Sequence, residues 1–503
     1  MLTPRLIRSS KQKQIIQRIL TRRNDLIAIL ILLFVAIGVR IVYQHESIVN
    51  NPLRADAGKY FSAAYNLHQF GLYSTDRPRR DRKPPDTRTD LSPGYPLFLT
   101  LFMGDGILDQ LNEFVARVLR VQAVMGALVA VFTFLTARLY LNFAWALLAG
   151  TLTAISPHLI ALDGFFLTES LFTFVLMLGT LVLSLAWRTD RVALTLIGGL
   201  LLAASAEIRA VSYLLVFFLA PALLFVRGRP SASIKGRWVR HLAAIALSFF
   251  VVIAAHREFV KFTVTHEPGI LAMITGKTNL HAVRDVPQKY VVFRSPWTYL
   301  KRAVLPPKFF VDGNSHVFVT NRDRNWKIPT EASFAEAYIA YIKWILVGKI
   351  VVLWHFDNAY NGDVYIYPMV RRGFDENQTL QLVHGFMRAA HWPLFVLSIA
   401  APVILFVLWR KGTLPTRVLP ILLPVLGFVY FFAVLWLLSW LPRYTIPVRP
   451  FSYILAMYSL SVAAVALWRA KSIAPVKASG DNQGSGDPPP RSRPRRNKHG
   501  LRG

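Results

Sequence analysis

The sequence of 503 residues contains no cysteine, which excludes disulfide bonds, thiolate metal sites and thiol nucleophiles. Acidic residues are scarce, with 27 Asp and Glu against 58 Lys and Arg and a formal net charge of +31. Much of this charge lies at the chain ends and in short connections, a pattern typical of cytoplasmic flanks of membrane proteins and not of nucleic-acid binding. The sequence also lacks a Gly-x-x-x-x-Gly-Lys-Ser/Thr loop, which argues against ATP-driven transport by this chain alone.

Apolar residues dominate what is present. Hydrophobic residues make up 54% of the chain and aromatic residues 13%, and the mean hydropathy is +0.39. Because no ordinary soluble domain of this length has such a composition, we expect an all-α polytopic membrane protein. Runs of about 20 apolar residues predict about 10 transmembrane helices. They lie at residues 25–44, 118–140, 143–161, 165–187, 192–208, 211–227, 238–256, 392–410, 418–438 and 447–468.

The distribution of basic residues predicts the orientation of these spans. Residues 1–24 carry many Lys and Arg and no acidic residue, and every second connection that follows is also basic. The positive-inside rule therefore places both termini in the cytoplasm, with residues 471–503 as a disordered basic tail. We expect a multi-pass protein of a cell inner membrane, and an endoplasmic-reticulum membrane is the alternative. A further apolar stretch at 340–356 contains Lys343 and Lys349. We interpret it as a helix that lies on the membrane surface and does not cross it.

The predicted organisation is thus a cytoplasmic leader, one transmembrane domain at 25–470, and the tail. Two long segments of that domain, 45–117 and 257–391, fall on the outer, periplasmic face. Long connections are usually functional or disordered, and the many aromatic residues in both segments argue against disorder. We expect both to fold against the membrane and to form a site there. The charged insertion at 77–90 either recognises an anionic acceptor or forms a flexible lid.

Asp56 is an isolated carboxylate just after the first predicted span. Apolar residues follow it at helical spacing, at Phe61, Ala64 and Tyr65, so the pattern predicts a short surface helix that begins at Asp56. A carboxylate in this place can act as a general base towards a hydroxyl or an amine. It can also serve only as a helix cap.

Other ionisable residues lie at the outer ends of predicted spans. Glu169, Glu207 and Arg209 are candidates because desolvating a charge in a membrane is costly, although they can also simply neutralise partners in the bundle. Arg443 and Arg449 either bind a phosphate or anchor the last span at the interface. The histidines predicted to face outward lack metal-binding spacing, so the sequence predicts no metal site, and a divalent metal is left open. These are His158, His256, His281 and His355.

The order of these residues resembles the GT-C superfamily of integral-membrane glycosyltransferases, especially the dolichyl-phosphate-mannose protein mannosyltransferase and aminoarabinose transferase branch. The motifs are an early acid in the first outer segment, a Pro-Gly-Tyr-Pro turn, a Thr-Glu pair, an arginine near the fifth span, a Gly-x-x-Asn-Leu stretch and a final Arg-Tyr pair. In this sequence they fall at Asp56, at 92–96, at Thr168 with Glu169, at Arg209, at Gly276 to Leu280, and at Arg443 with Tyr444.

The resemblance implies a hexosyl- or pentosyltransferase that moves a sugar from a polyprenyl-phosphate carrier to a lipid, glycan or protein acceptor at the outer face, with inversion. In that scheme Asp56 is the catalytic residue and deprotonates or orients the acceptor. Arg209 and Arg443 bind the departing lipid phosphate, with Arg449 as a further candidate. The residues expected to support the site or line an acceptor groove are Tyr60, Tyr95, Glu169, Glu207, Asn279 and Tyr444.

The sequence departs from the family at one catalytic position. Many protein mannosyltransferases have two adjacent acids where this chain has Asp56 followed by Ala57, so a second carboxylate cannot be placed there. Two other functions remain open. A transporter or flippase of lipid-linked sugars would share the spans, and a non-catalytic envelope-assembly protein would use the outer segments as binding surfaces.

Overall fold

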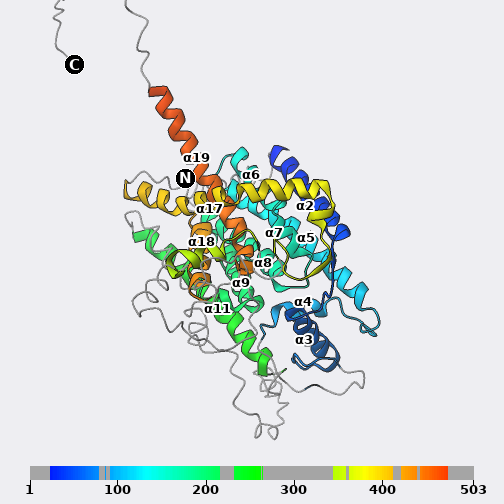
Figure 1. Cartoon of the computed structure of the whole chain (residues 1–503). Helices are drawn as coiled ribbons and strands as arrows, with labels where there is room; N and C mark the ends of the chain where they lie inside the picture. Colours follow the sequence, from blue (N-terminus) through cyan, green and yellow to red (C-terminus); the bar gives the residue numbers. More distant parts are fainter. Residues whose placement is uncertain are drawn as a thin grey trace, which may run out of the picture. The chain divides into compact units, whose positions relative to one another are not determined.

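The computed structural model describes residues 23–78, 85, 91–215, 232–261, 263, 344–357, 362–411, 421–438 and 442–473. The chain divides into two units, Met1–Ser461 and Val462–Gly503, and the boundary falls within the last helix. The described part is helical apart from two short strands, as the all-α prediction requires (Figure 1). Strands β1 (Ile48–Val49) and β2 (Met369–Arg371) pair antiparallel, and they join the two predicted outer segments.

The helices coincide with most of the predicted spans, and short helices lie between them. They are α2 (Arg23–Glu46), α3 (Asp56–Phe70), α4 (Gly94–Thr100), α5 (Leu111–Arg138), α6 (Phe143–Ala154), α7 (Pro157–Asp163), α8 (Thr168–Thr189), α9 (Val192–Ile208), α11 (Ala232–Val260), α15 (Lys349–Leu353), α16 (Gly373–Glu376), α17 (Gln378–Arg410), α18 (Leu422–Leu438) and α19 (Arg449–Ile473). Short 3₁₀ helices are η1 (Ala210–Ser212) and η6 (Pro442–Val448), and η4 (Trp344–Gly348) is a π-helical turn.

Six of the described helices are long and apolar enough to cross a membrane, or up to seven if the bent pair α6 and α7 forms one span. Two shorter apolar helices, at Val192–Ile208 and Leu422–Leu437, coincide with further predicted spans. The predicted span 211–227 lies outside the described residues beyond Leu215. The membrane class is therefore supported by length and composition, and the count of about ten stays a prediction.

The predicted continuous span at 143–161 is wrong in one respect. The helix is interrupted between Ala154 and Pro157, and the two parts are bent by 47°. Pro157 is the first residue of α7 and has no N–H to continue α6. The Nη1 atom of Arg40 donates to the carbonyl of Ala154 at 3.0 Å and so satisfies a backbone group that the break leaves free.

Two other boundaries also differ from the predictions. The helix predicted at 392–410 begins at Gln378, because the Asn377 side chain caps it by accepting from the N–H groups of Thr379 and Leu380. The stretch at 340–356 is predicted to lie on the membrane surface, and in its described part the helix ends at Leu353. Lys349 of that helix is buried and donates to the carbonyl of Leu437 at 3.4 Å, so it packs on α18.

Neighbouring helices pack in the order α2 on α5, α5 on α6 and α8, α8 on α9, and α9 on α11. Small side chains lie where α2, α5 and α6 meet, as close packing of membrane helices requires. They are Ala36, Ala127, Ala130 and Ala154.

Ion pairs and hydrogen bonds mark two ends of the bundle. At one end Asp25 of α2 pairs with Arg138 of α5 at 3.0 Å, and Arg188 of α8 donates to the carbonyl of Leu139. Asp190, just after α8, pairs there with a histidine of α11. We call this the Asp25 end, and we call the opposite end, where α8 begins and α9 finishes, the Asp56 end.

Helices α9 and α11 are parallel. Thr195 near the start of α9 contacts His241 near the start of α11 at 2.5 Å, and Glu207 at the end of α9 contacts His256 near the end of α11 at 2.6 Å. A parallel pair of consecutive described helices is the arrangement that the predicted span between them requires.

Candidate active site

Asp56 is the first residue of α3, as predicted, and the backbone around it is tightly folded. Ala55 has φ 51°, in the left-handed region that L-residues rarely adopt. A Cβ on Gly58 would lie 2.5 Å from the carbonyl oxygen of Leu53, so the preceding turn packs directly on the first turn of the helix. The Asp56 side chain is not engaged in capping its helix, because the bond found for it goes to another part of the chain.

That partner is Arg443 in η6. Its Nη2 atom donates to Oδ2 of Asp56 at 2.7 Å, and the two side chains are 17% and 35% exposed, with the arginine the more buried. The predicted base and a predicted phosphate ligand therefore touch each other. Because about a third of the carboxylate surface remains accessible, a bound molecule can still reach Asp56.

A second ion pair lies beside the first. Arg209, in the extended residue after α9, donates from Nη1 to Oε1 of Glu169 at 2.7 Å and to Oγ1 of Thr168 at 3.2 Å. Nε of Arg443 lies 3.8 Å from the same Glu169 oxygen. The Glu169 side chain is only 2% exposed, and two cations together with the N-terminus of α8 compensate for that burial.

The ring of Tyr444 lies against both arginines. The guanidinium carbon of Arg209 is 4.5 Å from the ring centroid, and that of Arg443 is 5.1 Å from it. Cation–π contacts at these distances hold the two planar groups in place next to one another. We call this set the Asp56 cluster: Asp56, Glu169, Arg209, Arg443 and Tyr444.

Two tyrosines support the cluster from α3 and α4. Tyr60 and Tyr95 pack edge to face, with centroids 5.3 Å apart. Burial, and then the charge of Glu169, raises the pKa of Tyr60, and burial raises the pKa of Tyr95 well above its usual value. Both phenols therefore remain protonated and can act as hydrogen-bond donors.

The glycine of the Pro-Gly-Tyr-Pro turn has a steric role. A Cβ on Gly94 would lie 2.7 Å from the carbonyl oxygen of Glu207 and 2.9 Å from a side-chain carbon of Ile208. Only glycine lets α4 approach the end of α9 this closely. The turn thereby sets the position of Tyr95 relative to the cluster.

Besides Tyr60 and Tyr95, two described residues of the predicted site, Glu207 and Arg449, lie outside the Asp56 cluster. Glu207 pairs with His256 at 2.6 Å and with the hydroxyl of Tyr213 at 2.6 Å. Arg449 is buried and donates from Nη1 to Nδ1 of His391 at 3.2 Å. Asn279 lies outside the described residues, as does most of the insertion at 77–90.

The sequence analysis missed Gln122, which lies behind the site. Its side-chain oxygen accepts from the hydroxyl of Tyr95 at 2.7 Å, and its nitrogen donates to the carbonyl of Phe165 at 2.8 Å. It thus connects α4 to the segment that leads into Glu169. The only signal for it is one amide side chain within an apolar run.

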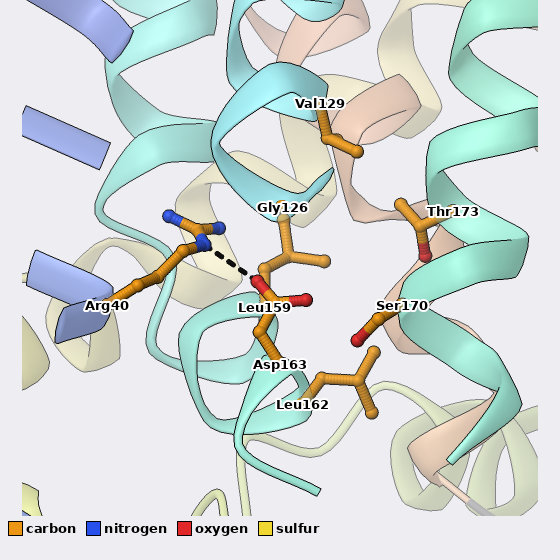
Figure 2. Close-up of a pocket in the computed structure, with 8 residues that line it drawn as sticks. All are labelled: Arg40, Gly126, Val129, Leu159, Leu162, Asp163, Ser170 and Thr173. Carbon is orange, nitrogen blue, oxygen red and sulfur yellow. Dashed lines mark hydrogen bonds and ion pairs between the residues drawn. The ribbon is translucent and has the colours of Figure 1, made fainter. Parts of the chain in front are cut away.

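A buried ion pair that was not predicted lies deeper in the bundle (Figure 2). Nε of Arg40 in α2 donates to Oδ2 of Asp163 at the end of α7, at 2.6 Å. A Cβ on Gly126 would lie 1.8 Å from the same carboxylate oxygen, so α5 passes directly against the pair. A cavity lies beside the pair, and it is lined by Arg40, Gly126, Val129, Leu159, Leu162, Asp163, Ser170 and Thr173. The signal available was an arginine inside the predicted span 25–44 and an aspartate between the predicted spans 143–161 and 165–187.

Within the described part of the chain, no group of three or more His, Asp or Glu side chains is placed to hold a metal ion. These residues can act through charged groups that the surrounding structure holds in fixed positions. The Asp56 cluster combines a partly exposed carboxylate with two arginines that are oriented by an aromatic ring and by a buried carboxylate. Such a site can bind an anionic group and can orient a hydroxyl next to it.

No family model and no curated protein matches the chain. Among solved structures, it is similar to the archaeal oligosaccharyltransferase AglB from Archaeoglobus fulgidus in complex with an inhibitory peptide and a dolichol-phosphate, with 14% identity, a TM-score of 0.46, and coverage of 91% of this chain and 53% of that one. It is also similar to the Archaeoglobus fulgidus oligosaccharyltransferase tethered with an acceptor peptide, with 16% identity, a TM-score of 0.46, and coverage of 91% and 52%. The chain spans about half the length of these proteins, and at this identity and TM-score the likeness carries no argument for the function proposed below.

Proposed function

We propose that this chain is a membrane glycosyltransferase of the GT-C type, which moves a sugar from a polyprenyl-phosphate carrier to an acceptor at the outer face of the membrane. The observation that carries the proposal is the Asp56 cluster. Its members come from α3, from the start of α8, from the end of α9 and from η6, and they meet at one end of the apolar helices. These are also the residues on which the sequence resemblance to the superfamily depends.

The arginines suit the leaving group of this reaction. As the bond between the anomeric carbon and the phosphate oxygen breaks, negative charge collects on the phosphate and positive charge on the sugar ring. Nη1 of Arg443 makes no hydrogen bond to a described residue, so it can donate to that phosphate, and Arg209 contacts the same Tyr444 ring. Donors already held in place stabilise the developing charge without reorganisation.

Asp56 suits the acceptor side. In the structure it is paired with Arg443, and a donor phosphate that competes for Arg443 would leave the carboxylate available to a hydroxyl. Attack from the face opposite the phosphate gives inversion, which needs no covalent intermediate on the protein.

The test is transfer of label in membranes. Membranes with wild type or with Asp56→Asn receive a radiolabelled polyprenyl-phosphate sugar fraction extracted from the host, and label is followed into lipid, polysaccharide and protein. Label that moves with wild type and stays on the carrier with Asp56→Asn supports both the reaction and the residue. Label that stays on the carrier with both proteins contradicts the proposed function, and equal transfer by both removes Asp56 from the mechanism.

A further inference from the structure

The end of α9 carries a second charged pair, separate from the Asp56 cluster. Oε2 of Glu207 lies 2.6 Å from Nδ1 of His256, and Oε1 accepts from the hydroxyl of Tyr213 at 2.6 Å. Because a carboxylate can only accept, Nδ1 carries a proton, and in the neutral imidazole Nε2 then has the lone pair. Nε2 forms no hydrogen bond with a described residue. The ring is therefore oriented by a carboxylate and has one nitrogen open to accept a proton.

Helix α11 also carries a second histidine beside a carboxylate, and in that pair both ring nitrogens of the histidine have partners. At the Asp25 end of α11, Nε2 of His241 lies 3.1 Å from Asp190 and its Nδ1 lies 2.5 Å from the hydroxyl of Thr195. Both ring nitrogens are engaged, and the side chain is 2% exposed, against 18% for His256. His241 has the arrangement of a structural histidine, whereas His256 has that of a general base with an orienting carboxylate.

The pair lies near the helix that carries Asp56. The end of α11 packs on α3, the helix that begins with Asp56: Phe259 and Val260 contact a small core of Ala63 and Tyr73. The rings of Tyr73 and Phe259 are 5.4 Å apart. His256 therefore lies one turn from the contact with α3.

The carboxylate of the pair is also tied to the Asp56 cluster through the backbone. Glu207 precedes Arg209 by two residues, and its carbonyl oxygen is the atom that Gly94 of α4 approaches. Tyr95, the next residue of α4, packs on Tyr60 of the Asp56 helix.

We propose that His256 is the base that takes the proton from the acceptor hydroxyl, and that Glu207 is its positioning residue. This inference rests on the proposed glycosyl transfer. The acceptor oxygen forms a bond to the anomeric carbon while the bond from that carbon to the phosphate oxygen breaks. The electron pair leaves with the phosphate, and Arg209 and Arg443 stabilise its negative charge. The acceptor proton moves to Nε2 of His256. Glu207 stabilises the imidazolium that results, and Asp56, released from Arg443 by the donor phosphate, orients the acceptor hydroxyl.

The groups around His256 define the expected pH dependence. Glu207 and, through it, Tyr213 face the ring from outside α11, and Arg257 and the Glu258–Lys261 pair at 3.6 Å follow on α11 itself. Because only the neutral imidazole accepts a proton, transfer by the wild type is expected to be faster at alkaline pH than at acidic pH.

The experiment compares His256→Asn with His241→Asn in the full chain. Asparagine can still donate to the neighbouring carboxylate but has no basic nitrogen. Initial rates of transfer from the radiolabelled polyprenyl-phosphate sugar are measured from acidic to alkaline pH, and binding of the same labelled carrier to the purified protein is measured in parallel. His256→Asn is expected to bind the carrier like wild type, to transfer about 10²–10⁴ times more slowly, and to lose the rise with pH. His241→Asn is expected to keep that rise.

Two further variants separate the outcomes. Added imidazole is expected to restore part of the transfer by His256→Ala and none by Asp56→Asn, and Glu207→Gln is expected to shift the pH profile. His256→Asn that transfers at the wild-type rate, or that loses carrier binding together with transfer, overturns the inference and leaves the proposed function intact. A wild type that binds the carrier but transfers nothing to any fraction overturns the proposed function, and the inference falls with it.

Discussion

Asp56 and Arg443 lie 387 positions apart in the sequence and form an ion pair of 2.7 Å. The same guanidinium lies 3.8 Å from Glu169, which is itself bound to Arg209. One arginine thus connects a carboxylate that solvent reaches with a carboxylate that it does not. Changes on either side of Arg443 are therefore expected to affect different properties, activity on the Asp56 side and stability on the Glu169 side.

Asp56→Asn is expected to abolish label transfer while the protein stays folded. The pair is partly exposed, so its loss costs below about 1 kcal/mol of unfolding free energy. Thermal unfolding of the purified protein in detergent checks this, beside the transfer assay. A fall in melting temperature as large as that of Glu169→Gln would contradict the assignment of Asp56 to the reaction.

Glu169→Gln is expected to be strongly destabilising, by about 3–5 kcal/mol, because it leaves Arg209 without its buried counter-charge. Arg209→Gln is expected to cost less, since Glu169 keeps Arg443 at 3.8 Å and the Thr168 hydroxyl at 3.1 Å. The double variant is expected to lose less than the sum of the two single variants, by about 0.5–3 kcal/mol. Unfolding measured for all four proteins at one temperature gives this coupling, and strict additivity would contradict the pair.

Gly94→Ala is expected to lower both stability and transfer, because the added carbon meets the backbone of α9, which cannot move aside like a flexible side chain. A cost of about 1–3 kcal/mol is expected. Gly104→Ala is the matched control, since Gly104 lies in the same predicted outer segment and has nothing within 4 Å of its added carbon. Equal behaviour of the two variants in the unfolding and transfer assays would show that α4 does not need this contact.

Asp163→Asn is expected to destabilise more than Asp25→Asn. Both remove the acid of a pair between helices, but the Arg40 side chain is 1% exposed and cannot reach solvent, whereas that of Arg138 is 16% exposed. The first change therefore leaves a buried unpaired charge, at about 3–5 kcal/mol. The yield of folded protein in membranes and the unfolding temperature measure the difference, and the reverse order would contradict the buried pair.

The spans were predictable because each needs only a run of apolar residues of the right length. The break after Ala154 was not, since Ser156 and Pro157 are too few to change the average hydropathy of a run that is apolar on both sides. The start of α3 at Asp56 followed from apolar spacing, but its distant partner could not follow from any local pattern.

Within the site, the sequence grouped residues that the backbone separates. Glu207 and Arg209 are two positions apart, but α9 ends at Ile208 and Arg209 is extended, with φ −145° and ψ 114°, so the two side chains find different partners. Arg443 and Arg449 are separated by a 3₁₀ segment that rises about 2.0 Å per residue, which moves Arg449 along the axis to His391. Neither the hydropathy pattern nor the order of the motifs shows where α9 ends or that a 3₁₀ segment separates the two arginines.

The distance along the chain between Asp56 and Arg443 also determines the time that passes between the synthesis of these two residues. At about 5–20 residues per second, the 387 positions between them take about 20–80 s to synthesise. During that interval Asp56 enters the membrane first, Glu169 and Arg209 follow, and the last member of the cluster is still to be translated. A nascent chain released before Arg443 is synthesised would therefore contain the Asp56 carboxylate without its counter-charge.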